Sequence, residues 1–121
     1  MTIDAENNAS TLAENLWASL DDGKAIDIRT LDVRRLTVIT DFMLVASGRS
    51  SRQVKALTRR VREKANATGA TIIGIEGERQ AQWVLVDLDD VVVHIMQPEA
   101  RDFYQLEKLW SAHIPAQADV I

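Results

Sequence analysis

Residues 87–96, DLDDVVVHIM, bring three carboxylates and an imidazole within eight positions. Asp87 and Asp89 are two residues apart, so on an unbroken strand both carboxylates would point the same way, as two-metal phosphoryl transfer requires. Polar residues between two apolar runs are also typical of a tight hairpin turn, in which Asp89 would point elsewhere. The segment therefore predicts either a metal-dependent catalytic site at Asp87 and Asp89 or a turn between two strands.

The catalytic alternative has one more point in its favour, the segment SGRSS at residues 47–51. It precedes a predicted helix, and backbone amides at a helix N-terminus can hold a phosphate, as in nucleotidyltransferases. Gly and Ser before a helix also serve simply as caps. His94 stands in a predicted strand without a Ser/His/Asp or paired-histidine arrangement, and such a lone histidine is more often structural than a ligand or a base.

Length and composition limit the class of protein. A chain of 121 residues is sufficient for one domain with its own hydrophobic core. It contains no cysteine, which excludes disulfides, thiolate nucleophiles and cysteine-ligated zinc sites. The first residues, MTIDAENNAS, lack the basic and apolar parts of a signal peptide, and no apolar run reaches the roughly 20 residues of a membrane span. We expect a soluble, cytoplasmic protein that does not associate with membranes.

Positive charge is concentrated in one predicted helix, although the chain as a whole carries a net charge of −4. The acidic balance argues against general coating of nucleic acid. A local positive face could dock on a phosphate-rich assembly at one place, but such a face is more often an ordinary solvated helix face, and we favour that interpretation. The cations are Arg49, Arg52, Lys55, Arg59, Arg60, Arg62 and Lys64, with Glu63 the only acid among them.

Hydrophobic periodicity and capping residues predict three helices. The first starts at a capping box at 11–14 and ends before Gly23, the second starts at a capping box at 50–53 and ends near Gly69, and the third starts at Pro98. Their predicted buried stripes are Leu12, Ala13, Leu16, Trp17 and Leu20 in the first, Val54, Leu57 and Val61 in the second, and Phe103, Leu106, Leu109 and Trp110 in the third. Tyr104 falls off the third stripe and is expected to be exposed.

Five segments have the pattern of strands, namely 25–31, 42–46, 71–75, 82–87 and 91–96. Residues 42–46 are continuously apolar, as in a strand covered on both faces. The order αββαβββα predicts a single α/β domain, a mixed sheet of about five strands with flanking helices.

The last two strands predict a hairpin with a mixed face. A two-residue turn would pair Trp83 with either His94 or Met96, and in both registers the same faces result. One face is purely aliphatic and therefore core: Val84, Val86, Val91, Val93 and Ile95. The other has the composition of a recognition patch: Trp83, Leu85, Asp87, Val92, His94 and Met96. The residues alone leave Trp83 open between core packing and an interface anchor.

Three collinear stretches closely resemble the ribosomal silencing factor family, also called the Iojap-related family, over about residues 10–111. They are LDVRRLTVITDFMLVASGRSSRQV, EGERQAQWVLVDLDDVVVHIM and RDFYQLEKLW, with the motifs ITD at 39–41, SG at 47–48, RQV at 52–54, WVLVD at 83–87 and DVVVH at 90–94. The family often has glycine where this chain has Asp89 in the predicted turn, and tyrosine where it has Phe42.

The resemblance implies a nucleotidyltransferase-like fold without demonstrated nucleotidyl transfer. It implies a non-enzymatic repressor, without a cofactor or small-molecule substrate, that binds the large ribosomal subunit through its fourteenth protein. There it would block joining of the small subunit in starvation or stationary phase, with nearby ribosomal RNA as a further partner if the basic helix reaches it. The family's partner-facing tryptophan and tyrosine match Trp83 and Tyr104. We add Asp87, His94 and Met96 from the face argument and Arg101 from the R-x-F-Y motif.

Domain boundaries and oligomeric state complete the expectations. We expect a flexible N-terminus at 1–9, the ribosomal silencing factor domain at 10–111 and a C-terminal tail at 112–121. An apolar recognition face left bare favours self-association, so we expect a homodimer when the protein is isolated. The alternative remains a nucleotidyltransferase-like enzyme that uses Asp87 and Asp89.

Overall fold

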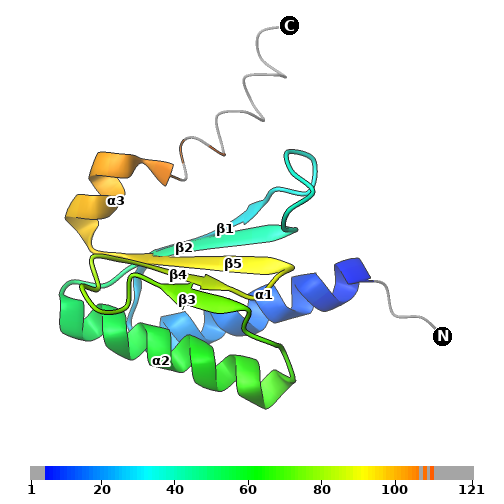
Figure 1. Ribbon diagram of the computed structural model, residues 1–121, viewed down its shortest axis with the longest axis horizontal. Helices are drawn as coiled ribbons and strands as arrows, with labels where there is room; N and C mark the ends of the chain where they lie inside the picture. The colour runs from blue at the N-terminus through cyan, green and yellow to red at the C-terminus, as the bar shows by residue number, and fades with distance from the viewer. Residues whose placement is uncertain (1–4, 107, 109, 111–121) are drawn as a thin grey trace, which may run out of the picture.

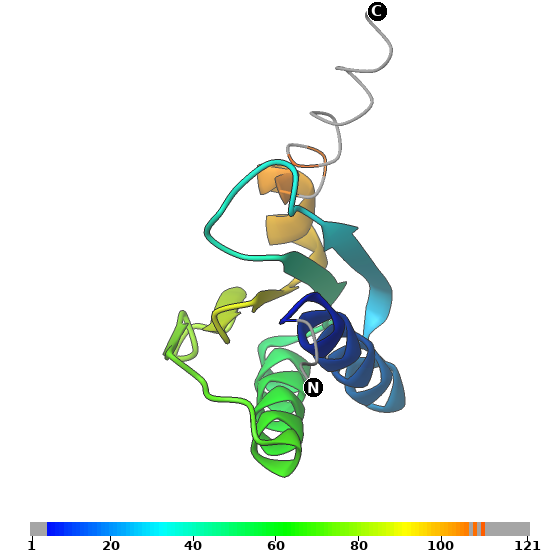
Figure 2. The same cartoon turned by 90° about the vertical axis from the view of Figure 1, so that its right-hand side faces the viewer.

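The computed structural model describes residues 5–106, 108 and 110. A five-stranded sheet is covered on one face by α1 (Ala5–Asp22) and α2 (Ser51–Thr68) and on part of the other by α3 (Pro98–Tyr104), as the two perpendicular views in Figure 1 and Figure 2 show. The predicted order αββαβββα and the α/β class are confirmed. Among the described residues, no helix has the length and apolarity needed to cross a membrane.

The sheet is mixed, and its spatial order is β1-β2-β5-β4-β3. Its strands are β1 (Ile26–Asp32), β2 (Phe42–Ser47), β3 (Gly74–Glu76), β4 (Trp83–Asp87) and β5 (Val91–Met96). β2 and β5 run parallel, and the other three neighbouring pairs are antiparallel. All six residues of β2 are buried, as its continuously apolar sequence predicted.

The helices on the first face pack against the larger core, in which the aliphatic side chains of β4 and β5 meet those of α1 and α2. Leu16 and Leu20 of α1 and Leu57 of α2 are fully buried there. Half of the second capping box is confirmed, because Ser50 Oγ accepts from the backbone N–H of Gln53 at 3.1 Å, whereas Gln53 Oε1 accepts from the N–H of Arg49 at 2.7 Å rather than from that of Ser50. Gly69, with φ 81°, ends α2 as predicted, in the left-handed conformation that glycine adopts without strain.

The ends of two helices were predicted wrongly. α1 begins at Ala5 rather than at the capping box at 11–14, so residues 5–9, expected to belong to a flexible N-terminus, are helical. Ala9 is buried against the core and extends the stripe by one more turn. α3 ends at Tyr104, because Gln105 adopts a left-handed conformation with φ 50°.

Two aromatic residues predicted to be core are exposed. Trp17 is 39% exposed, and Phe103, predicted as part of a buried stripe, is 79% exposed in the last turn of α3. Leu106 and Trp110 are partly buried, as expected for that stripe, and pack against the smaller cluster on the α3 side. Leu109 and the tail at 112–121 lie outside the described residues.

A candidate partner-binding surface on the α3 side of the sheet

The β4–β5 hairpin has one of the two predicted registers. Trp83 pairs with Met96, and the turn consists of Asp89 and Asp90, closed by the Leu88 N–H donating to the Val91 carbonyl at 2.9 Å. The predicted division of faces is confirmed for the core side, where Val84, Val86, Val91, Val93 and Ile95 are all fully buried. Trp83 and Met96 pack into the other cluster, on the α3 side.

Asp87 ends β4 and Asp89 lies in the turn, so the two are not a pair of converging ligands. The Asp89 backbone N–H donates to Asp87 Oδ1 at 2.9 Å, and Asp89 itself has φ 73°, a strained value for a residue with a side chain. Burial, followed by the negative charges of Asp41 and Asp89, raises the pKa of the Asp90 carboxyl. Among the described residues, no three or more His, Asp or Glu side chains gather closely enough to hold a metal ion. The turn interpretation of the opening segment is therefore confirmed.

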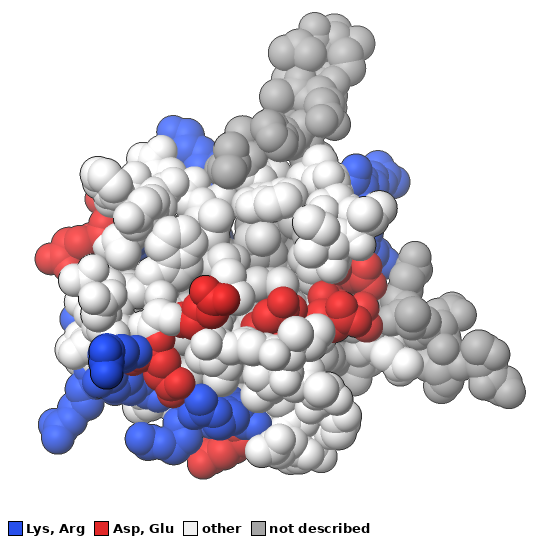
Figure 3. Space-filling view, viewed as in Figure 1, with Lys and Arg blue, Asp and Glu red and all other residues white. Residues whose placement is uncertain are grey.

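Three aromatic rings from β4 and α3 form a continuous cluster, called here the aromatic cluster: Trp83, Phe103 and Tyr104. The ring centroids of Trp83 and Tyr104 are 4.7 Å apart, and the Phe103 and Tyr104 rings meet edge to face at 4.9 Å. Trp83 is half-buried, whereas Tyr104 is 54% exposed, as predicted, and Phe103 is 79% exposed. In Figure 3 uncharged side chains cover most of the α3 side in the upper half of the view, and Lys and Arg gather below, toward α2.

The buried His94 fixes the position of the Trp83 indole through a hydrogen bond. Its ring is buried, with 4% exposure, and its Nδ1 accepts a hydrogen bond from Trp83 Nε1–H at 2.9 Å. Burial disfavours the charged imidazolium and lowers the pKa of His94 to about 4. The imidazole is therefore neutral at pH 7, with its proton on Nε2, which leaves Nδ1 free to accept.

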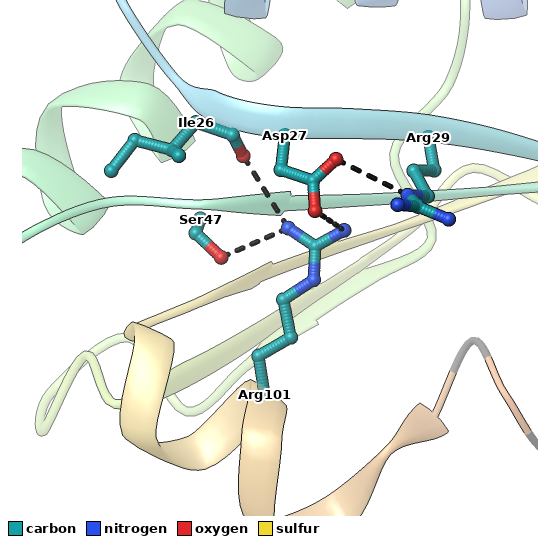
Figure 4. Close-up of polar contacts among 5 residues, drawn as sticks. All are labelled: Ile26, Asp27, Arg29, Ser47 and Arg101. Atoms are coloured by element: carbon teal, nitrogen blue, oxygen red, sulfur yellow. Dashed lines mark hydrogen bonds and ion pairs between the residues drawn. The ribbon is translucent and has the colours of Figure 1, made fainter.

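Arg101 anchors α3 to the sheet. Figure 4 shows its guanidinium pointing from α3 between the first two strands, where Nη1 donates to Ser47 Oγ at 2.9 Å and to the Ile26 carbonyl at 3.3 Å. Its Nη2 lies 3.6 Å from Asp27 Oδ2, and Asp27 also accepts from Arg29 Nε at 3.2 Å. Asp27 has φ 51° at an irregularity in the β1–β2 pairing. Only 8% of Arg101 is exposed, so its contacts are within the protein.

The six residues predicted for the site thus divide into two groups. Trp83 and Tyr104 meet in the aromatic cluster and reach the surface, and Asp87 is half-buried at the other end of the same face of β4. His94, Met96 and Arg101 are buried, because α3 covers this end of the sheet, and they support the surface from beneath. The structure adds Phe103 to the candidate surface, because the helical period had placed it in a buried stripe; the motif R-x-F-Y was the signal that could have included it.

Comparison with known proteins identifies the family. A family model described as "Ribosomal silencing factor during starvation" matches residues 6–120. The ribosomal silencing factor RsfS of Chromobacterium violaceum is 47% identical over 100 residues, which cover 83% of this chain and 82% of that protein. RsfS of Bacillus subtilis is 39% identical over 103 residues, covering 85% and 87%. The chloroplastic protein Iojap of Zea mays is 32% identical over 118 residues, covering 96% of this chain and 51% of that protein.

The fold agrees with these relationships. A crystal structure of a protein from Chromobacterium violaceum superposes with a TM-score of 0.83 at 44% identity, covering 84% of this chain and 85% of the other. A crystal structure of a Bacillus halodurans protein superposes with a TM-score of 0.76 at 38% identity, covering 84% and 94%. The chain belongs to the ribosomal silencing factor family.

Proposed function

We propose that this protein is a cytoplasmic translational repressor that binds the large ribosomal subunit through its fourteenth protein. When it is bound to the large subunit, it sterically blocks joining of the small subunit and lowers translation in starvation or stationary phase. Membership of the ribosomal silencing factor family supports action on the ribosome. The observation that carries the proposal is the aromatic cluster, an exposed apolar surface on a face of the sheet that α1 and α2 leave free.

The aromatic cluster has the composition of a binding surface. Aromatic residues are enriched in the buried centres of protein interfaces, and they supply much of the binding free energy there. Phe103 and Tyr104 offer exposed rings, and Trp83 is fixed between Tyr104 and His94. Asp87 supplies a carboxylate at the far end of the same strand face. A partner protein with an apolar pocket and a nearby cation would be complementary to this surface.

Sedimentation tests the proposal directly. The protein is expected to co-sediment with purified large subunits and to be missing from fractions of joined ribosomes. Adding it to separated subunits should lower the yield of joined ribosomes, and purified ribosomal protein fourteen should bind it without ribosomal RNA. Equal association with joined ribosomes and large subunits would contradict a steric block.

We propose further that the protein acts without catalysis. The Asp87 carboxylate accepts a hydrogen bond from the Asp89 backbone N–H. The enzymatic alternative requires the carboxylates of Asp87 and Asp89 to converge on a metal ion, and this turn geometry does not support that arrangement. Titration with nucleoside triphosphates and Mg²⁺ is expected to give no specific signal. A metal-dependent binding signal that disappears in Asp87→Asn would favour the enzyme instead.

The basic face of α2 is expected to play no part in binding the large subunit. α2 covers the face of the sheet opposite the aromatic cluster, and Arg62 already pairs with Glu78 through two hydrogen bonds of 3.0 and 3.2 Å. Reversing the exposed Arg52 and Arg59 to Glu should leave both the affinity and its salt dependence unchanged. If these residues contact ribosomal RNA, each lost contact should reduce the slope of log K against log salt by about 0.7–0.9.

The isolated protein is expected to form a homodimer, because the exposed rings of Phe103 and Tyr104 gain free energy when a second copy covers them. Light scattering should give the dimer mass at micromolar concentrations, and Phe103→Ser should shift the equilibrium toward monomer. A monomer across the whole micromolar range would contradict this expectation.

A further inference from the structure

The loop between β1 and β2, residues 33–41, carries two aliphatic side chains into solvent at its tip. Val38 is fully exposed, with a relative accessibility of 103%, and Ile39 is 79% exposed. Figure 1 and Figure 2 show that the loop rises from the sheet on the same side as α3, away from α1 and α2. Neither side chain contributes to the core, so packing within the chain does not explain their apolar character.

Hydrogen bonds fix the base of the loop, and one more lies near its tip. The Val33 N–H donates to the Asp41 carbonyl at 3.0 Å, and the N–H groups of Asp41 and Phe42 donate to the Asp90 carbonyl at 2.9 and 3.1 Å. Nearer the tip, the Ile39 N–H donates to Thr37 Oγ1 at 3.1 Å. The exposed residues are β-branched and have few rotamers. Burying them against a partner would therefore cost little conformational entropy.

The loop and the aromatic cluster lie on the same side of the sheet. Leu36 of the loop and Trp83 pack against the same buried cluster on the α3 side. Trp83 of β4 pairs with Met96 of β5, and Met96 pairs with Ser47, the last residue of β2. The loop leads into Phe42, the first residue of β2, so it lies at the opposite end of the sheet. Five residue steps of a strand span about 17 Å. A standard interface of about 800 Å² per partner is wide enough to include both ends.

We propose that Val38 and Ile39 form a second contact with the same large-subunit protein that receives the aromatic cluster. This proposal rests on the function proposed above. The two contacts stand at opposite ends of the α3 side, with the half-buried Leu85, Asp87 and Val92 between them. The partner must therefore offer a small apolar pocket about 20 Å from its aromatic-binding pocket, a distance that combines about 17 Å along β2 with about 10 Å across the two strand spacings between β2 and β4. Two separated anchors fix the orientation of the bound protein, and steric exclusion of a second subunit depends on that orientation.

The test is the double variant Val38→Ser/Ile39→Ser, measured for binding to purified ribosomal protein fourteen and to large subunits. The melting temperature should stay at the wild-type value, because both side chains are exposed. Binding to both should weaken by about tenfold or more, as two aliphatic groups lose their buried contact. Ile73→Ser is the matched control: Ile73 is 59% exposed but lies beside the ends of α1 and α2, so its replacement should change nothing.

The outcomes separate this proposal from the function on which it rests. If the double variant binds like wild type while Trp83→Ala loses affinity, the second contact is wrong and the proposed function stands. If wild type binds neither target, the proposed function itself fails. If the double variant changes dimerisation in light scattering but leaves ribosome binding intact, the loop contacts a second copy of this chain and the proposal is overturned. A photo-crosslinking residue at position 38 should attach to ribosomal protein fourteen and to no other large-subunit protein.

Discussion

Replacing Trp83 by alanine is expected to weaken binding to the large-subunit protein by about 2 kcal/mol or more, roughly thirtyfold. The ring is half-buried, packs 4.7 Å from Tyr104 and is held by His94. A partner that covers this cluster would desolvate the ring fully, and alanine would leave its pocket empty. Titration calorimetry or an equilibrium binding assay with ribosomal protein fourteen measures the change.

Two controls separate binding from folding in this experiment. Trp17→Ala removes another partly exposed tryptophan, 39% accessible, from α1 on the opposite side of the sheet, and it should leave binding unchanged. Thermal melting of Trp83→Ala should show a smaller loss of stability than the roughly 3–5 kcal/mol typical of a fully buried tryptophan. A variant that melts far below wild type, yet binds normally while folded, would assign Trp83 to the core and remove the aromatic cluster from the interface.

Lowering the pH from 7 to 4 is expected to reduce the free energy of unfolding by about 3 kcal/mol through His94 alone. The folded-state pKa of about 4 lies below the ordinary 6.5, so between these values the unfolded chain binds more protons. The contribution of neutral His94 to the free energy of unfolding is therefore fully present above pH 6.5 and is lost progressively as the pH falls toward 4. A protonated Nδ1 would also be unable to accept a hydrogen bond from Trp83 Nε1–H. Protonation of His94 would therefore release the Trp83 ring of the aromatic cluster as it lowers the stability of the fold.

The matched variant for this measurement is His94→Asn, whose side-chain oxygen accepts a hydrogen bond but does not titrate. Urea unfolding of both proteins from pH 7 to 4 should show a steeper loss for wild type. Hydrogen bonding from Arg34 lowers the pKa of Asp32 from its ordinary 3.8. The contribution of Asp32 to stability is therefore lost mainly below pH 3.8, outside the range of this measurement. The raised pKa of Asp90 acts in the opposite direction, but both proteins contain that residue and the comparison cancels it. Parallel curves would show that His94 does not control acid stability.

The sheet and its hairpin could be predicted because their signals are local. Alternation with a period of two divides β4 and β5 into faces whichever register the turn selects, so the aliphatic face was correct before Trp83 was known to pair with Met96. The turn at Asp89 and Asp90 followed from polar residues between two apolar runs. β2 was recognised as interior from an apolar run that leaves no solvent-facing position.

The accessible part of the site could not be predicted, because it depends on where one short helix ends and what it covers. A left-handed Gln105 ends α3, and Phe103, which the helical period placed in a buried stripe, is exposed in the last turn. The packing of α3 on the sheet buries Met96 and His94, which hairpin alternation alone placed on an open face. The partners of Arg101 come from Ser47 and Asp27, 54 and 74 positions earlier in the chain, and no spacing rule relates them.

The parallel pairing of β2 with β5 has a consequence for how the protein is made. β5 is the neighbour that covers the inner edge of β2, and it is synthesised about 50 residues later, a delay of roughly 3–10 seconds at ordinary elongation rates. During that interval β2, which is buried along its whole length in the finished fold, has only β1 to pair with. The backbone groups on its other edge stay open to water or to chaperones. Since Trp83, Phe103 and Tyr104 also follow β2 in the chain, the surface proposed to bind the large subunit is completed only after β2 has already been synthesised.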